Sequence, residues 1–219
     1  MSLNKELEIL HEEILASLPP EVNKQLIVEN KILFTSFLEE KALKEGSAVP
    51  NVLFHDKNLK PVYLWDLLKE HHVVLSFFRG TWCPYCNLEL KALNKIEKKI
   101  REKGAILIAV TPELYEHSEE IITKNEIELT VMTDLGNKAA DKFGLVFELP
   151  QKYRELYKSL NIYLNVLNGE DRWTLPMPAT FIINKDGIAV STFINADYTQ
   201  RMEPDMVLEQ LSLLNSSEK

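Results

Sequence analysis

The segment Val73–Leu88 constrains the fold more than any other part of the chain. It begins with an apolar run from Val73 to Phe78, interrupted only by Ser76 and closed by Gly80. A run of this length, rich in Val and Phe, predicts a buried β-strand. Apolar residues at helical spacing follow a Cys-Pro-Tyr-Cys motif; they are Leu88, Leu90, Leu93, Ile96 and Ile100. The segment therefore predicts a strand, a short loop, the cysteine motif and a helix, in this order.

The two cysteines occupy positions that favour redox chemistry. Cys83 falls at the start of the predicted helix, and Pro84 takes a first-turn position that tolerates proline. Free backbone N–H groups and the positive end of the helix dipole then face the Cys83 sulfur and favour the thiolate. Cys86 follows one turn later on the same face, within reach of a disulfide. We therefore expect Cys83, as the more exposed and more acidic cysteine, to attack, and Cys86 to resolve.

A zinc site and a pair of ordinary buried cysteines are the alternatives. Zinc would need two histidines, because the chain has no further cysteine, and none of the five stands in a paired His spacing. Both cysteines share one motif beside Trp82 at a strand-to-helix junction, which favours a redox pair over structural cysteines. We expect no metal and no cofactor, and we interpret His71 and His72 as solvated residues at the strand edge.

Several motifs resemble a known superfamily. The residues from Phe78 to Cys86 resemble a thioredoxin active site, and their inner dipeptide is similar to that of glutaredoxins. Together with Ala179–Gly187 and Asn195–Pro204, they resemble the peroxiredoxin-like proteins of the alkyl hydroperoxide reductase/thiol-specific antioxidant (AhpC/TSA) superfamily. The resemblance implies an α/β, thioredoxin-like fold with three layers and a mixed central sheet.

The resemblance also implies which residues support the cysteines. Thioredoxin-fold proteins carry a cis-proline opposite the cysteine motif, and Pro178 matches it, so the backbone of Met177 would face the substrate. Arg79 and Arg201 are the candidates for the arginine that stabilises the thiolate in peroxiredoxins. The remaining supporting residues belong to the motif itself: Thr81, Trp82, Pro84 and Tyr85.

The chain departs from both families at positions that matter for the chemistry. Thioredoxins have a buried Asp where this chain has Phe77, so a carboxylate base is missing there. Peroxiredoxins have a Pro and a Thr or Ser, which align the peroxide, where this chain has Ser76 and Gly80. Thr81 lies one residue away from the second position. The peroxide-aligning network of peroxiredoxins is therefore not simply transferable.

The chain divides into an N-terminal helical extension, residues 1–45, and a redox domain, residues 46–219. Helical spacing of apolar residues predicts helices over 3–18 and 20–44, separated by Pro19-Pro20. This extension could be a docked arm, a dimer contact or a loose tail, and its apolar positions favour docking or a homodimer.

The domain itself follows the order βαβαβ and then ββα. We expect strands over 104–111, 129–134, 179–184 and 188–194, helices over 65–70, 112–125, 137–143, 150–160 and 204–214, two short strands within 51–64, and a long loop over 161–173.

Charge and hydropathy exclude some partners. The net charge of −8 disfavours nucleic acid and anionic membrane surfaces. No apolar segment reaches the roughly 18 residues that span a bilayer, and the first residues lack the pattern of a signal peptide. A reactive dithiol in such a chain predicts a cytoplasmic protein.

Three functions fit these observations. The favoured hypothesis is a thiol-dependent peroxidase, in which Cys83 attacks a hydroperoxide, Cys86 resolves the sulfenic acid, and thioredoxin, glutaredoxin or glutathione reduces the disulfide. The alternative is a thiol–disulfide oxidoreductase acting on protein or glutathione disulfides. An alternative of another class is a non-catalytic redox sensor that signals through its N-terminal helices.

Overall fold

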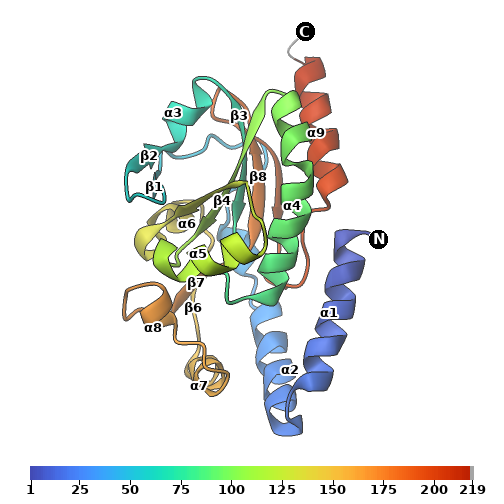
Figure 1. The fold of residues 1–219 in the computed structure, drawn as a ribbon, viewed down its shortest axis with the longest axis vertical. Helices are drawn as coiled ribbons and strands as arrows, with labels where there is room; N and C mark the ends of the chain where they lie inside the picture. Colours follow the sequence, from blue (N-terminus) through green and yellow to red (C-terminus); the bar gives the residue numbers. More distant parts are fainter. Residues whose placement is uncertain (218–219) are drawn as a thin grey trace.

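A mixed β-sheet runs through the middle of the molecule in the computed structural model, which describes residues 1–217 (Figure 1). Within these residues, β3, β4 and β5 are parallel, β8 and β9 continue the sheet beyond β3 in antiparallel pairs, and β1 and β2 complete the other edge. The order across the sheet is β2 (Pro61–Tyr63), β1 (Leu53–His55), β5 (Thr130–Thr133), β4 (Ala105–Thr111), β3 (His72–Phe77), β8 (Ala179–Ile183) and β9 (Ala189–Ile194).

Helices cover both faces of this sheet. The helix that carries the cysteine motif, α4 (Pro84–Glu102), packs on β4 and lies beside α9 (Pro204–Ser217), which packs on β8. Two short helices, α3 (Leu64–Leu68) and α6 (Lys138–Lys142), contact β3 and β1 from the other side. The expected thioredoxin-like fold with a mixed sheet is therefore confirmed.

The central strand is buried along its whole length, as its apolar run predicts. All six residues of β3 are buried, including His72 at its start, so the expectation that His72 is solvated was wrong. Near its carboxyl end, Phe77 packs against Phe143 and Phe181, with ring centroids 5.2 Å and 6.2 Å away. An aromatic cluster thus occupies the position where thioredoxins place their buried carboxylate.

Two helices and a 3₁₀ turn form the N-terminal segment: α1 (Leu3–Ser17), α2 (Pro20–Phe34) and Leu38–Lys41. The second helix ends about ten residues before the expected boundary at 44. Thr35 and Ser36 follow it and turn their hydroxyls back to the carbonyls of Lys31 and Leu33, which competes with helix propagation. Phe37 then adopts a left-handed conformation that no helix continues.

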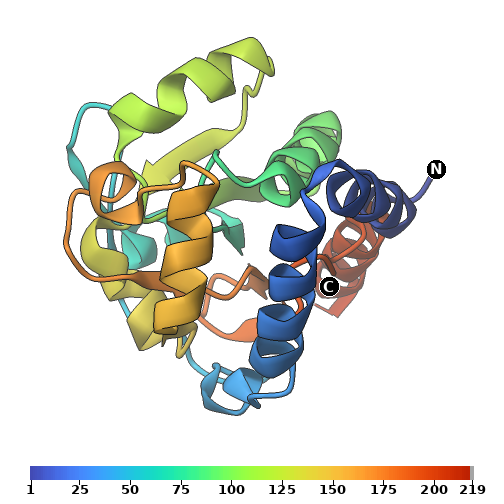
Figure 2. The same cartoon turned by 90° about the horizontal axis from the view of Figure 1, so that it is seen from below.

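We call α1 and α2 together the α1–α2 hairpin. It lies against the end of the sheet where the cysteines are, with α2 beside α7 (Gln151–Ser159) and α1 beside α4 (Figure 2). Leu7 on α1 is fully buried, and Leu26 and Leu33 on α2 are also in the core. The N-terminal helices are thus docked on the rest of the same chain, although Ile27, Val28 and Ile32 on α2 remain exposed.

The segment between β5 and β8 contains more structure than the sequence predicts. After α5 (Tyr115–Lys124) and β5, a short antiparallel pair forms from β6 (Val146–Glu148) and β7 (Thr174–Pro176). The expected loop over 161–173 includes α8 (Leu164–Leu167). Elements of three or four residues are too short to show a period, so the sequence pattern did not reveal them. Of the helices among residues 1–217, none is long and apolar enough to cross a membrane.

Candidate functional site

Cys83 is the N-cap residue of α4, at the point where the chain leaves β3, and Pro84 is the first residue of the helix. The Cys83 carbonyl accepts a hydrogen bond from the N–H of Asn87, so the helix begins directly after the cysteine. Pro84 is exposed, whereas Tyr85 and Cys86 point into the protein. Both cysteines are free thiols with no exposed surface. The expectation that Cys83 is the more exposed cysteine was therefore wrong, because the chain packs over the helix start.

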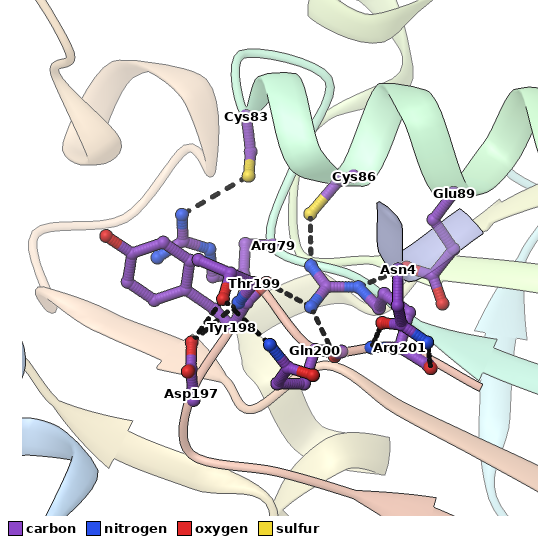
Figure 3. A network of polar contacts seen from close by, with 10 residues as sticks. All are labelled: Asn4, Arg79, Cys83, Cys86, Glu89, Asp197, Tyr198, Thr199, Gln200 and Arg201. Atoms are coloured by element: carbon purple, nitrogen blue, oxygen red, sulfur yellow. Dashed lines mark hydrogen bonds and ion pairs between the residues drawn. The ribbon is translucent and has the colours of Figure 1, made fainter. Parts of the chain in front are cut away.

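Each sulfur faces a buried arginine (Figure 3). The Nη2 of Arg79 lies 3.2 Å from the Cys83 sulfur, and the Nη2 of Arg201 lies 3.5 Å from the Cys86 sulfur. Arg79 comes from the loop after β3, and Arg201 from the segment between β9 and α9. The two candidate arginines thus reach different cysteines, and only Arg79 contacts the sulfur at the helix N-terminus.

Arg201 connects Cys86 to a buried carboxylate that the sequence analysis did not single out. Its Nε donates to the Oε2 of Glu89 at 2.6 Å, and both side chains are 2% exposed. Its Nη1 donates to the carbonyls of Tyr198 and Gln200. Glu89 follows Cys86 by three residues, on the apolar face of α4. A charged residue on such a face is the signal that could have identified it.

These contacts separate the two cysteines electrostatically. Burial on its own would raise the pKa of Cys83, but a hydrogen bond from Cys86 and the charges of Arg79 and Arg201 outweigh it and hold this pKa well below the ordinary value. Burial, together with the hydrogen bond and the negative charge of Cys83, raises the pKa of Cys86 well above its ordinary value. Cys83 is therefore the thiolate and Cys86 the thiol of the reduced pair.

Charge balance supports the same assignment. Arg79 and Arg201 are both buried, and burial of an unpaired charge is costly. Glu89 pairs with Arg201, and burial raises the pKa of Glu89 although the arginine opposes this shift. Arg79 has no carboxylate partner among residues 1–217, so the Cys83 thiolate supplies the counter-charge. In turn, the Cys83 charge helps to keep the pKa of Arg79 well above its ordinary value, against the effect of burial.

The loop between β3 and α4 is held by a second buried carboxylate, Glu113. Its Oε2 accepts from the backbone N–H and the hydroxyl of Thr81, at 2.7 Å and 2.8 Å. The Thr81 hydroxyl is therefore directed to Glu113 rather than to either sulfur. Gly80 has a φ of +147°, and a Cβ there would lie 2.2 Å from the indole Nε1 of Trp82. A hydroxyl side chain at position 80 would thus collide with Trp82.

Aromatic side chains enclose Arg79. Its Nη1 donates to the hydroxyl of Tyr157 at 3.0 Å, and its guanidinium carbon lies 3.8 Å from the ring centroid of Tyr198 and 5.1 Å from that of Trp82. Burial raises the pKa of Tyr157 above its ordinary value and that of Tyr198 to about 12, so both hydroxyls stay protonated. The sequence pattern gave no sign that tyrosines so far apart in the chain meet at one arginine.

Two residues of the α1–α2 hairpin bind tyrosines of this enclosure. His11 Nδ1 lies 2.8 Å from the hydroxyl of Tyr85, which is the third residue of the cysteine motif. The Oδ1 of Asn30 accepts hydrogen bonds from the hydroxyls of Tyr198, at 3.0 Å, and Tyr153. The hairpin therefore contacts the environment of the cysteines through side chains, as well as through apolar packing.

The expected cis-proline is absent. Among residues 1–217 no peptide bond is cis, so the Met177–Pro178 bond is trans and this expectation was wrong. Both residues are buried, and the Met177 N–H donates to the carbonyl of Leu145. This bond extends the β6–β7 pairing by one residue, so the Met177 N–H is already used within the fold. Within the same residues, no three His, Cys, Asp or Glu side chains are grouped for a metal ion.

The chain is similar in sequence to a thiol–disulfide oxidoreductase and in fold to peroxiredoxin-like proteins. The chain is 27% identical over 182 residues to the thiol-disulfide oxidoreductase ResA of Bacillus anthracis. The alignment covers 81% of this chain and 88% of that protein. A peroxiredoxin-like protein from Aquifex aeolicus shares the fold with a TM-score of 0.62, at 20% identity, over 79% of this chain and 88% of that one. Peroxidoxin BcpB from Mycobacterium tuberculosis also shares the fold, with a TM-score of 0.60 and 19% identity. The comparison covers 78% of this chain and 98% of that one.

The family assignment rests on a larger part of the chain than the cysteine motif. Residues 46–191 match the model of the AhpC/TSA family; they include the sheet from β1 to the start of β9, α4 and both cysteines. The α1–α2 hairpin, Tyr198 and Arg201 lie outside the matched residues. With a match over most of its length and the cysteine pair of a thiol oxidoreductase, the chain belongs to the AhpC/TSA family.

Proposed function

We propose that this protein is a thiol–disulfide oxidoreductase. The observation that carries the proposal is that a different buried arginine contacts each sulfur, Arg79 at Cys83 and Arg201 at Cys86, and only Cys83 lies at the helix N-terminus, which favours a thiolate at Cys83 and a thiol at Cys86. Thiol–disulfide exchange needs a thiolate to attack and a second thiol to release the product. The similarity to an oxidoreductase of this name over most of the chain supports the same reaction class.

The reaction has two exchange steps. The Cys83 thiolate attacks one sulfur of a substrate disulfide, forms a mixed disulfide and releases the other sulfur as a thiolate. Cys86 then loses its proton and attacks the Cys83 sulfur, which closes the intramolecular disulfide and releases the second substrate thiol. The substrate gains two electrons and the protein loses two. A dithiol such as thioredoxin or glutaredoxin returns the protein to the reduced state; two molecules of glutathione do so when the substrate is a disulfide other than glutathione disulfide.

Burial of both sulfurs bears on the substrate. The site is covered by the tyrosines around Arg79 and by the α1–α2 hairpin that binds them. A bulky protein disulfide meets Cys83 only after this cover opens, whereas a small disulfide needs a smaller opening. We therefore propose low-molecular-weight disulfides as the preferred substrates of the closed form.

A thiol peroxidase is the second candidate, and the contact between Arg79 and Cys83 favours it. The resemblance to peroxiredoxins implies such an arginine at the thiolate. Two residues argue against a peroxidase, because no hydroxyl is available to align the peroxide. Position 80 is a glycine, and the Thr81 hydroxyl binds Glu113. Peroxide would then react with Cys83 no faster than with a free thiol of similar pKa.

Stopped-flow fluorescence separates the two candidates, because Trp82 adjoins Cys83. The reduced protein is mixed with glutathione disulfide and, separately, with hydrogen peroxide. Each second-order rate constant is compared with that of a small thiol after correction for the thiolate fraction. We expect acceleration of disulfide exchange alone. Acceleration with peroxide and none with disulfides would assign the protein as a peroxidase. The Trp82→Phe variant identifies the signal.

A further inference from the structure

Asn30 on α2 stands at the meeting point of the hairpin and the thiolate site. Its side chain is buried, with 6% of the residue exposed, and its Oδ1 accepts from the hydroxyls of both Tyr153 and Tyr198. These tyrosines come from α7 and from the segment after β9, so one amide oxygen joins three parts of the chain. A buried oxygen with two hydroxyl donors fixes both rings in place.

Tyr198 transmits this contact to Arg79. Its ring lies against the guanidinium carbon at 3.8 Å, the geometry of a cation–π interaction. The same ring makes T-shaped contacts with Phe34 and Tyr85, both at 5.5 Å between centroids. Arg79 in turn contacts the Cys83 sulfur. Its Nε has no hydrogen-bond partner among the described residues, so the Tyr198 and Trp82 rings, the Tyr157 hydroxyl and the Cys83 sulfur orient the guanidinium.

We propose that Asn30 is a positioning residue for Cys83: it fixes the Tyr198 ring beneath the Arg79 guanidinium, and so makes the α1–α2 hairpin a working part of the thiolate site. The proposal rests on the role of Cys83 as the attacking thiolate. It extends the site to a helix that lies outside residues 46–191, the part matched by the family model. Asn30 acts through Tyr198 and Arg79 and does not touch the reacting sulfur.

The two tyrosines offer a matched pair of variants. Tyr198→Phe and Tyr153→Phe each remove one hydroxyl from the same Asn30 oxygen and leave the other bond in place. Only Tyr198 lies against Arg79. Asn30→Ala removes both bonds. The other groups that act on Cys83 are unchanged in all three variants: Arg201, Cys86, Glu89, Glu113, Tyr85 and Tyr157.

The test is the ionisation of Cys83, followed as thiolate absorbance at 240 nm in the reduced protein, with the Cys83→Ser form of each variant as the blank. We expect Asn30→Ala and Tyr198→Phe to raise the Cys83 pKa by less than about 1 unit, because Arg79 keeps its charge and only its position relative to the sulfur changes. Tyr153→Phe should keep the wild-type value. Wild-type values in both Asn30→Ala and Tyr198→Phe, or an equal rise in Tyr153→Phe, would overturn the proposal.

This readout is independent of the proposed reaction. If the protein is not an oxidoreductase, disulfide exchange is slow while the pattern of Cys83 pKa values still holds. If Asn30→Ala does not fold, Tyr198→Phe alone decides, because it leaves the Asn30 oxygen bonded to Tyr153.

Discussion

The guanidinium of Arg79 and the sulfur of Cys83 form a buried contact of 3.2 Å at the N-terminus of α4. Both side chains are buried, and each stabilises the charged form of the other. The helix N-terminus favours the same thiolate. The acidity of Cys83 therefore has two sources, one local to the helix and one that depends on the arginine and on the side chains that hold it.

Replacing Arg79 tests the second source. Arg79→Met removes the charge beside the sulfur and should raise the Cys83 pKa by about 1–3 units. Arg79→Lys should recover only part of this, because one ammonium group does not reproduce the fork that spans Tyr157 and Cys83. Thiolate absorbance measures both values. Arg101→Met, at an exposed end of α4, is the control and should leave the Cys83 pKa unchanged.

The stability of the reduced protein should depend on pH through Cys83. The folded pKa of this thiol is lower than that of the unfolded chain, which is about 8.5. Between the two values the unfolded chain holds a proton that the folded protein has released, so the free energy of unfolding rises with pH. The contribution is complete above about pH 8.5 and is lost as pH falls through the folded pKa.

Urea unfolding at several pH values measures this dependence. Cys83→Ala should abolish the rise, and it should destabilise the protein most at the higher pH, where it leaves Arg79 without its counter-charge. An unchanged pH dependence in Cys83→Ala would assign the rise to other groups.

The pair of Glu89 and Arg201 lends itself to a double-mutant cycle. Removal of one partner leaves a buried charge unpaired, so Glu89→Met and Arg201→Met should each cost about 3–5 kcal/mol of unfolding free energy. The double variant should cost clearly less than the sum, because it leaves no unpaired charge. Additive losses would mean that the two charges do not stabilise each other.

Leu7 connects the hairpin to the accessibility of the cysteines. It is fully buried on α1, so Leu7→Ala should cost about 2–5 kcal/mol. Because α1 packs on α4, part of this loss should appear as local opening over the cysteine motif. Alkylation of Cys83 by iodoacetamide should then become faster at a fixed pH. Ile27→Ala, at an exposed position on α2, should change neither stability nor labelling.

The sequence pattern predicted the parts of the fold that local physics controls. The apolar run at Val73 and the helix that begins directly after Cys83 both carry their own signal, and each lies where the pattern placed it. The predicted end of α2 was wrong because the hydroxyls of Thr35 and Ser36 bond back to helix carbonyls. The β6–β7 pair was not predicted because its strands are too short to show a period.

The surroundings of the cysteines were harder to predict, because they depend on contacts between distant segments. Arg79 and Arg201 were candidates for the same role, and only the folded chain assigns them to different sulfurs. The side chains around Arg79 and Cys83 include tyrosines and a hairpin from separate parts of the chain. Among the residues that the sequence analysis missed, Glu89 carried a local signal, a charge on the apolar face of α4.

The central claim is that Cys83 is a thiolate at neutral pH although it is buried. Its most direct test is a pH titration of thiolate absorbance at 240 nm in the reduced wild-type protein, since absorbance does not require access to the sulfur. Cys83→Ser and Cys86→Ser assign the signal. The account predicts a Cys83 midpoint below about 7.5, with Cys86 ionising well above it. A Cys83 midpoint near the free-thiol value of about 8.5, or a first ionisation that belongs to Cys86, would contradict it.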